Sequence, residues 1–433
     1  MFRVIRGGAV IGFLLKGLLR DRSRSLFPIL VVVAGVMLTV FMEAWVSGEN
    51  YEFVRSSAAF QTGHVKVTTR AYAEKADEMP NDLAIEGAGQ LLSELRSQFP
   101  RLVWIPRIKF GGLLDVPDST GETRAQGPVA GIAVSLLSDS SPEPKLLKLE
   151  QALVRGRMPQ KPGEIIVSED LARKLNVGPG DLVTLFGSTM YGSMASANFT
   201  IAGTIRFGIT ALDKGAVIAD VADVQAALDM GDAAGEIVGF FRDGEYNDRR
   251  AQQVTKEYNA RYDGTRDQFA PVMATLPDQG GLRQVLKLHG FSLGIVIAVF
   301  LSAMSLVLWN AGLMGSLRRY GEFGVRLAIG ERKAHLYRTL VAESVIVGVI
   351  GSVLGTALGL AVSYWLQARG LDFGSLMKGS TLMYSQVIRP HVTPSCWFIG
   401  LIPGLGATIV GAMISGATVF RRQTATLIKE LEQ

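Results

Sequence analysis

The sequence predicts an α-helical membrane protein with four transmembrane helices, both termini in the cytoplasm, and a large external α+β domain. Four long runs contain no Asp, Glu, Lys or Arg, namely residues 25–42, 290–317, 344–368 and 392–420. A helix needs roughly 20 apolar residues to cross a bilayer, so each run is a candidate transmembrane helix. The first run is short, but apolar residues 44–46 extend it past Glu43. Between the first two runs lie about 240 residues of mixed composition, enough for a folded domain.

The charges outside these runs predict the orientation. Residues 1–25 carry six Lys and Arg residues against one acid, and residues 318–343 carry another six. The long segment 47–289 carries 26 basic residues against 31 acids. Short cytoplasmic flanks are enriched in Lys and Arg, whereas long translocated domains escape this rule, so both termini and residues 318–343 are expected in the cytoplasm. The net charge of +5 then reflects topology, and no nucleic-acid partner is predicted.

The runs and the charges together set the expected limits of each part of the chain. An amphipathic helix at 1–24 is expected to lie in the membrane interface, with a frayed arm as the alternative. The parts expected after it are a transmembrane helix at 25–47, the external domain at 48–287, a transmembrane helix at 288–317, a cytoplasmic segment at 318–343, a transmembrane helix at 344–368, an external loop at 369–391, a transmembrane helix at 392–420 and a cytoplasmic tail at 421–433.

Local patterns in the external domain predict a mixture of strands and helices. Ser168 is expected to cap the helix that follows it. Residues 188–198, rich in Gly, Ser and Met, are expected to form a hairpin excursion. The expected strands are 63–69, 164–168, 180–187, 199–205 and the start of 216–231, and the expected helices are 86–99, the remainder of 216–231, and 249–262.

Sequence motifs for catalysis, metal binding and nucleotide binding are absent. The chain contains no phosphate loop of the G-x-x-x-x-G-K-[ST] type, no H-E-x-x-H and no G-x-S-x-G. The four histidines are scattered along the sequence, at His64, His289, His335 and His391. No catalytic residue, no metal site and no cofactor bound by this chain are therefore predicted.

The candidate membrane spans contain a glycine stripe, one acidic residue and one cysteine whose roles the sequence suggests. Gly351, Gly355 and Gly359 form a small-residue stripe, which favours close helix packing over a substrate-lining role. Glu43 is the one acid inside a candidate span, and it is expected at the membrane interface, with a cargo or proton site as the alternative. The single cysteine, Cys396, is expected to be a packing residue.

The charged segment 318–343 lies between two apolar runs and is helix-prone. Gly330 is expected to end one helical piece, and residues 331–344 are expected to begin another. Because nothing else in the chain supplies energy, this cytoplasmic segment is the expected contact with a soluble ATPase. A positively charged loop without a partner is the alternative.

The stretch RRYGEFGVRLAIGERKAHLYRTLVAESVIVGVIGSVLGTALG, residues 318–359, resembles the permease domain of the MacB/FtsX-like (type VII) ABC transporters. The matching positions are Arg319, Glu322, Gly324, Ala328, Gly330, Glu343, Gly351, Gly355 and Gly359. The resemblance implies a non-enzymatic permease subunit that couples ATP hydrolysis by a separate ATPase to movement of its external domain. The residues expected at the ATPase contact are Glu322, Gly330, Glu331, Arg332, Lys333, His335, Leu336, Tyr337 and Glu343.

Residues 155–228 are similar to the lipoprotein-releasing, LolC/LolE-like permeases. This similarity implies a porter-like part at 48–127 and 233–287 and an inserted β-rich part at 128–232. In such permeases an excursion at the position of 188–198 contacts a soluble carrier, with a plain mobile hairpin as the alternative here. The residues expected at that contact are Ser188, Met190, Tyr191 and Met194.

The resemblance also implies partners and a location. The implied partners are two copies of a separate ABC ATPase, which holds ATP and Mg, a second permease that is identical or homologous, membrane lipid, and a periplasmic carrier or adaptor. The implied location is the bacterial inner membrane with the large domain in the periplasm, and the implied cargo is a lipoprotein or another amphiphile. Two other functions stay open: an ATP-driven, FtsX-like regulator of a periplasmic wall hydrolase, and a sensor that acts without ATP.

Overall fold

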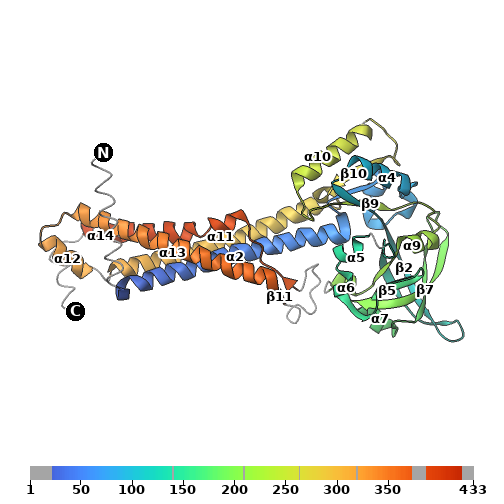
Figure 1. Cartoon of the computed structure of the whole chain (residues 1–433), viewed down its shortest axis with the longest axis horizontal. Coiled ribbons are helices and arrows are strands. Elements are labelled where there is room, and N and C mark those ends of the chain that lie inside the picture. The colour runs from blue at the N-terminus through green and yellow to red at the C-terminus, as the bar shows by residue number, and fades with distance from the viewer. Residues whose placement is uncertain are drawn as a thin grey trace. The chain divides into compact units, whose positions relative to one another are not determined.

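A computed structural model describes residues 22–138, 141–207, 210–262, 264–317, 320–372 and 387–421 (Figure 1). The chain divides into two compact units. Unit 1 comprises Met1–Tyr51, His289–Leu371 and Ile388–Gln433, and unit 2 comprises Glu52–Leu288 and Asp372–Val387. The expected interfacial helix except for residues 22–24, most of the expected loop 369–391, and the tail beyond residue 421 lie outside the described residues.

Within the described residues, four helices are long and apolar enough to cross a membrane. They are α2 (Arg22–Ser57), α11 (Leu282–Leu317), α13 (Lys333–Arg369) and the segment that ends in α14 (Thr408–Arg421), where a 3-10 turn (Pro394–Trp397) and a π-helical turn (Ile402–Ala407) come before α14. The end of α2 continues as a π-helical turn, η1 (Ala58–Thr62). The last residues of α2, η1 and the first residues of α11 belong to unit 2.

Helix packing in unit 1 is organised around a valine ridge on α2. The ridge consists of the buried residues Val32, Val36 and Val40, and the stripe of α13 that packs against it consists of Gly351, Gly355 and Gly359. A Cβ added at Gly355 would lie only 2.7 Å from the Cβ of Val36. The absence of side chains along this stripe therefore sets how closely α13 approaches α2. The buried Cys396 belongs to the same cluster.

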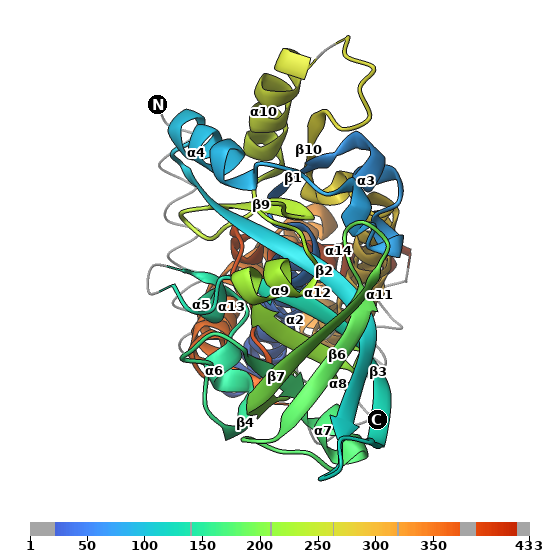
Figure 2. The same ribbon diagram turned by 90° about the vertical axis from the view of Figure 1, so that its right-hand side faces the viewer.

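Unit 2 is built on one ten-stranded sheet with the strand order β10-β1-β9-β2-β3-β8-β5-β7-β4, in which β6 pairs with β2 and β7 (Figure 2). The strands are β1 (Val65–Thr69), β2 (Leu102–Pro117), β3 (Thr123–Val134), β4 (Leu153–Gly156), β5 (Glu164–Ser168), β6 (Leu182–Ser188), β7 (Met194–Ile205), β8 (Ala216–Asp220), β9 (Glu236–Phe241) and β10 (Pro271–Thr275). Two further short strands, β11 (Leu371–Asp372) and β12 (Val387–Ile388), pair with each other. The remaining helices are α3 (Arg70–Glu74), α4 (Ala88–Gln98), α5 (Glu143–Leu146), α6 (Leu149–Ala152), α7 (Glu169–Leu175), α8 (Thr210–Asp213), α9 (Val221–Ala227), α10 (Asp248–Asn259) and α12 (Tyr320–Ala328).

The long strand β2 connects the two halves of the sheet. Its first part, Leu102 to Arg107, pairs with β9, and its second part pairs with β3 from Ile108 onward and with β6. This change of partner lies upstream of residue 128, the expected start of the β-rich insertion.

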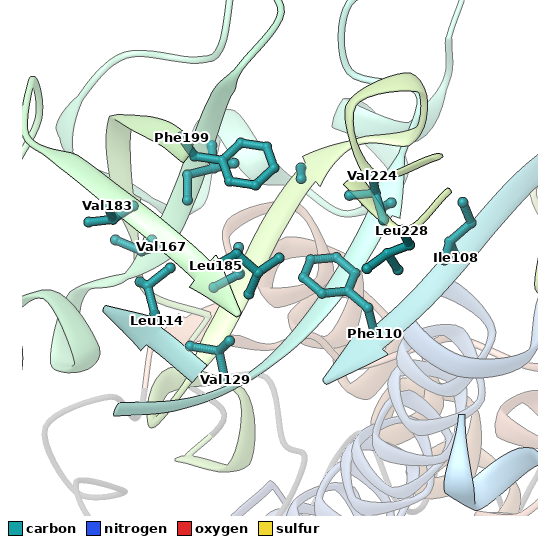
Figure 3. Packing of buried hydrophobic residues seen from close by; sticks show 14 of the residues in the cluster. Ile108, Phe110, Leu114, Val129, Val167, Val183, Leu185, Phe199, Val224 and Leu228 are labelled. Atoms are coloured by element: carbon teal, nitrogen blue, oxygen red, sulfur yellow. The ribbon is translucent and has the colours of Figure 1, made fainter. Parts of the chain in front are cut away.

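Each half of the sheet has its own hydrophobic cluster. Around the second part of β2, the buried side chains of Phe110 and Leu114 pack with residues from β3, β5, β6, β7 and α9 (Figure 3). The ring of Phe110 lies over Gly131, its neighbour on β3, where an added Cβ would clash with it. Around the first part of β2, Trp104 packs with Leu95 of α4 and Tyr258 of α10.

Several of the strands and helices expected in the external segment are confirmed, and one detail is wrong. Strand β5, the β8–α9 pair and helix α10 lie where the patterns predict them. Asp220 caps α9 by accepting a hydrogen bond from the backbone N–H of Ala222. Ser168 stands at the N-cap of α7, but its hydroxyl makes no such bond in the described part of the chain. It is also the last residue of β5 and fully buried, so its side chain belongs to the sheet.

His64 follows η1 and is buried against aromatic rings. Its Nδ1 accepts a hydrogen bond of 3.1 Å from the backbone N–H of Phe241, and its ring contacts those of Phe240, Phe241 and Tyr246. Burial lowers the pKa of His64 to about 4, outweighing the opposite influence of Asp243. The folded protein therefore holds this imidazole neutral at pH 5 to 6, whereas an unfolded chain would protonate it.

This difference predicts a pH dependence of stability. Because the pKa of His64 is lower in the folded state, protonation of His64 favours the unfolded chain. Its contribution to the free energy of unfolding is complete above about pH 6.5 and is lost as the pH falls toward 4, and the total loss is at most about 3 kcal/mol. Urea denaturation of the full chain in detergent at pH 7 and pH 4.5 measures the loss. In His64→Asn, whose side-chain oxygen still accepts the Phe241 N–H, the loss between these two pH values is expected to shrink. An unchanged loss in this variant would contradict the assignment to His64.

Candidate coupling segment and transmission junction

The expected ATPase-coupling segment forms a helix–turn–helix. Helix α12 ends in a turn at Gly330, whose φ of +99° favours glycine. The turn is closed by hydrogen bonds from the N–H of Gly330 to the carbonyl of Leu327 and from the N–H of Glu331 to the carbonyl of Arg326, both 3.1 Å. Helix α13 begins directly after it at Lys333 and continues to Arg369 as one of the four candidate membrane spans.

Two of the expected coupling residues face inward. Leu336 is buried with Leu340 and with Ala412 of α14. The ring of Tyr337 lies beside Gly416, where an added Cβ would be 2.7 Å from it. These side chains pack α13 against α14, so their substitution would disturb the helix bundle as well as any partner contact.

Other expected coupling residues lie together at the turn. The exposed His335 and the half-buried Glu331 approach within 3.9 Å, and Arg332 and Lys333 lie between them in sequence. Glu343 lies farther along α13 and is half-buried. Glu322 is in α12, and its side chain lies outside the described residues.

This segment also carries an exposed apolar pair that the sequence pattern did not predict. Val325 on α12 and Ile329 in the turn are four residues apart, and Ile329 is 82% exposed. Side chains four residues apart share one face of a helical turn. Leu327, between them, packs inward on the cluster of Leu336. The amphipathic spacing of VRLAI carries the signal, but only the packing shows which side is free.

The expected hairpin between β6 and β7 is shorter than the eleven residues 188–198. Its turn is closed by a 2.8 Å hydrogen bond from the N–H of Thr189 to the carbonyl of Ser193, and β7 already begins at Met194. Tyr191 and Met194 are 73% and 77% exposed. Met190 is buried, and its N–H bonds to the carbonyl of Leu228. Of the expected contact residues, Ser188, Tyr191 and Met194 are accessible, and Met190 anchors the turn.

Glu43 has a specific partner in unit 1. Its Oε1 accepts a 2.6 Å hydrogen bond from the hydroxyl of Ser395. Nearby, the N–H of His391 donates to the carbonyl of Ala44, and the backbone at Arg389 leaves no room for a Cβ at Gly48. The segment before α14 is thus fastened to α2, and Glu43 takes part in that fastening.

The structure reveals a second candidate site in unit 2, at the end of α2. Carbonyls of η1, which continues α2, are bound by side chains from the sheet and from the segment that precedes α11. Arg107 donates to the carbonyl of Ala59 (2.8 Å), Lys109 to that of Gln61 (3.3 Å), and Gln279 to that of Thr62 (3.2 Å). Cations at a helix C-terminus also offset its negative dipole end. We call η1 together with Arg107, Lys109, Glu143, Glu236 and Gln279 the transmission junction.

Buried ion pairs hold the junction together. The guanidinium of Arg107 forms two hydrogen bonds to the carboxylate of Glu143, of 2.7 and 2.9 Å, and both side chains are 0% exposed. Beside them, the buried Glu236 accepts from Lys66 at 2.9 Å and from Lys109 at 3.2 Å. Burial by itself would raise the pKa of Glu236, but Lys109 and Lys66 lower it to about 2. Glu236 is therefore ionised at any physiological pH.

The two helices that enter unit 2 meet in one apolar cluster beside these ion pairs. Ala58 of η1 and Leu282 of α11 are buried together with three residues of the sheet. Those sheet residues are Ile105, Val238 and Phe240. The end of α2 and the start of α11 are therefore fixed to the same part of the sheet.

Comparison with known proteins relates parts of the chain to one group of membrane proteins. Residues 294–424 match the family described as FtsX-like permease C-terminal. Over 159 residues the chain is 29% identical to the macrolide export ATP-binding/permease protein MacB 1/2 of Paracoccus denitrificans, a match covering 36% of this chain and 22% of that protein. Over 220 residues it is 23% identical to the lipoprotein-releasing system transmembrane protein LolC of Xylella fastidiosa, covering 48% of this chain and 51% of that protein.

Residues 294–424 therefore form an FtsX-like permease domain, and the chain is similar to permeases of the MacB/FtsX-like type. The resemblance stated from residues 318–359 is confirmed, and the assignment to the LolC/LolE-like branch stays a prediction. The chain spans about half or less of the length of these relatives. Among solved structures, the periplasmic region of MacB from Actinobacillus actinomycetemcomitans aligns with a TM-score of 0.32 at 12% identity, covering 52% of this chain and 94% of that one.

The transmission junction depends on Arg107, and a matched pair of variants tests this. Arg107→Met leaves Glu143 charged and buried, so the free energy of unfolding is expected to fall by about 3–5 kcal/mol. Arg206→Met, which removes the half-exposed pair with Asp170, is expected to cost about 1 kcal/mol or less. Urea denaturation of the full chain in detergent measures both. The double variant Arg107→Met/Glu143→Leu should regain much of the loss; equal losses in the two single variants would refute the role of the buried pair.

Proposed function

We propose that this permease is the membrane subunit of an ABC transporter in a bacterial inner membrane and works with a second permease and two copies of a separate ATPase. ATP and Mg bind in the ATPase, and the chain itself is not an enzyme. Both termini and the coupling segment lie in the cytoplasm, and unit 2 lies in the periplasm, in agreement with the distribution of positive charge. The observation that carries the proposal is the continuity of two long helices. Helix α13 runs without a break from the coupling turn through a candidate membrane span, and α2, another candidate span, continues into the transmission junction.

The input to this device is the exposed side of the coupling segment. Val325 and Ile329 offer an apolar contact, and Arg332 and Lys333 place positive charge next to it. Interfaces combine a buried apolar centre with a polar rim, and this arrangement supplies both. Closure of the ATPases on ATP would push on α12, and α13 would receive that push through Leu327.

The output is movement of unit 2. The carbonyl-to-side-chain bonds of the transmission junction and the buried Arg107–Glu143 pair join α2 to the sheet. The apolar cluster around Leu282 does the same for α11. A displacement of these two helices would therefore move unit 2 as a lever.

We propose a lipoprotein or a similar lipid-anchored amphiphile as the cargo. The name of the LolC relative and the similarity of residues 155–228 support this class. Within unit 1, α11 presents an apolar face that no other described part of this chain covers, with Phe291, Ile295 and Val299 exposed at four-residue spacing. An acyl chain that leaves the bilayer sideways needs such an uncharged surface.

Substitution of Ile329 tests the input. In Ile329→Asp a carboxylate replaces the exposed apolar contact, so the ATPase activity that copurifies with the tagged chain in mild detergent is expected to fall about tenfold. Val154→Asp, a substitution of the same kind at an exposed site of unit 2, is the matched control and should leave that activity unchanged. If wild type brings down no ATPase activity, the proposed mechanism is wrong. If Ile329→Asp brings down as much as the control, the contact lies elsewhere on the segment.

Photo-crosslinking tests the cargo. With p-benzoylphenylalanine at Ile295 of α11, we expect a crosslink to a triacylated lipopeptide in nanodiscs that hold the full chain. The same label at Val353, an exposed position of α13, serves as control and should give a much weaker product. A crosslink from position 295 only to a second copy of the permease would show that this face is a subunit interface, and would argue against the cargo proposal.

A further inference from the structure

One edge of β2, at residues 102–106, has no neighbouring strand in the described part of the chain, and Pro106 explains why. The β2–β3 ladder begins where Ile108 faces Ala133. Continued by two residues, this register places Pro106 opposite Ser135. Proline has no N–H to donate, so the ladder stops there and β3 ends at Val134. The first part of β2 is left with β9 on one side only.

The backbone groups at this open edge follow from the alternation of the ladder. The N–H of Arg242 donates to the carbonyl of Arg101 at 3.1 Å, so the odd-numbered residues of this part of β2 bond to β9. The even-numbered residues then direct their N–H and C=O groups to the open edge. The N–H of Leu102 is already bonded to Phe99. The groups left are the N–H of Trp104 and the carbonyls of Leu102, Trp104 and Pro106.

A cavity of about 250 Å³ runs along this edge. One wall is β2 from Leu102 to Pro106, and the other is the segment after β3, with the hydroxyl-bearing residues Ser135, Ser138 and Ser141. Two exposed arginines, Arg96 of α4 and Arg242, complete the lining, and no acidic residue is among the described residues that line it. Trp104 is 2% exposed, and its indole N–H has no partner within the described structure. The described lining thus combines free backbone groups with two positive charges, of which Arg242 also donates from its Nε to the carbonyl of Pro100 at 2.9 Å.

We propose that this cavity binds an extended, acidic peptide segment of another protein, which adds to the sheet as a strand beside β2. Unpaired backbone groups at a sheet edge select an extended chain, because alternate residues of the ligand can donate to the carbonyls of Leu102, Trp104 and Pro106 and accept from the N–H of Trp104. The two arginines select acidic side chains. The edge is about five residues long, or roughly 16 Å at the usual rise of a strand. A second copy of this chain fits less well, because pairing of the two edges brings the same arginines together.

The test uses a fluorescein-labelled hexapeptide of alternating Glu and Val, with fluorescence anisotropy on the full chain in nanodiscs. Binding to wild type is compared with binding to two double variants and with binding of a methylated peptide. Arg96→Glu/Arg242→Glu is expected to weaken binding at least tenfold. The control Lys174→Glu/Arg249→Glu has the same change of net charge at exposed sites of unit 2 and is expected to bind as wild type. A peptide of the same sequence N-methylated at alternate residues on its hydrogen-bonding edge is expected to lose binding to wild type, because it cannot donate to the carbonyls of β2.

Each other outcome overturns the proposal. Equal binding by the two double variants would show that the arginines do not select the ligand. Equal binding of the methylated and unmethylated peptides would show attraction by charge without strand addition. A third outcome is that wild type does not bind the peptide and that the particle mass measured by light scattering changes only in Arg96→Glu/Arg242→Glu. This result would assign the edge to contact between copies of this chain. None of these results depends on the ATPase or on the cargo.

Discussion

A buried arginine must have its charge neutralised where it lies, and in unit 2 this constraint falls on Arg107. Its guanidinium is fully buried, with two hydrogen bonds to the equally buried Glu143 and a third to the carbonyl of Ala59. Breaking a buried pair on one side leaves an uncompensated charge and costs several kcal/mol. The continuation of α2 in η1, strand β2 and helix α5 therefore cannot separate without that cost, and in the proposed mechanism this lets the junction pass a displacement on.

The position of Arg107 within β2 extends this constraint to the whole sheet. Strand β2 pairs with β9 up to Arg107 and with β3 from Ile108 onward, and its second part also pairs with β6. Both halves of unit 2 consequently share one continuous strand, and each half packs its own hydrophobic cluster on it. In the proposed mechanism this is why a push on one helix moves the entire unit. It also explains the open edge: at residues 102–106 only β9 flanks β2, whereas β3 and β6 flank its second part.

Prediction from sequence succeeds here for features that depend on local pattern. Uncharged runs predict the candidate membrane spans, and Gly330 predicts the coupling turn, because each signal lies within a few residues of the structure it causes. Strand β2 gives no such signal. Pro106 argues against a central strand, and Arg107 and Lys109 argue against burial. Their counter-charges are distant in sequence, since Lys109 and Glu236 are 127 residues apart. Such a strand is recognisable only when its partners are known.

The coupling segment shows how the same limit affects a candidate site. The charge pattern predicts an ATPase contact at the residues after Gly330, but two of them, Leu336 and Tyr337, pack α13 against α14. Which side of a short amphipathic helix is free depends on what covers the other side, and here Leu327 is covered while Ile329 is not. The two lie two residues apart at the end of α12. In the proposed mechanism, a partner that holds Ile329 acts on the same short segment whose inner residue contacts the α13–α14 core.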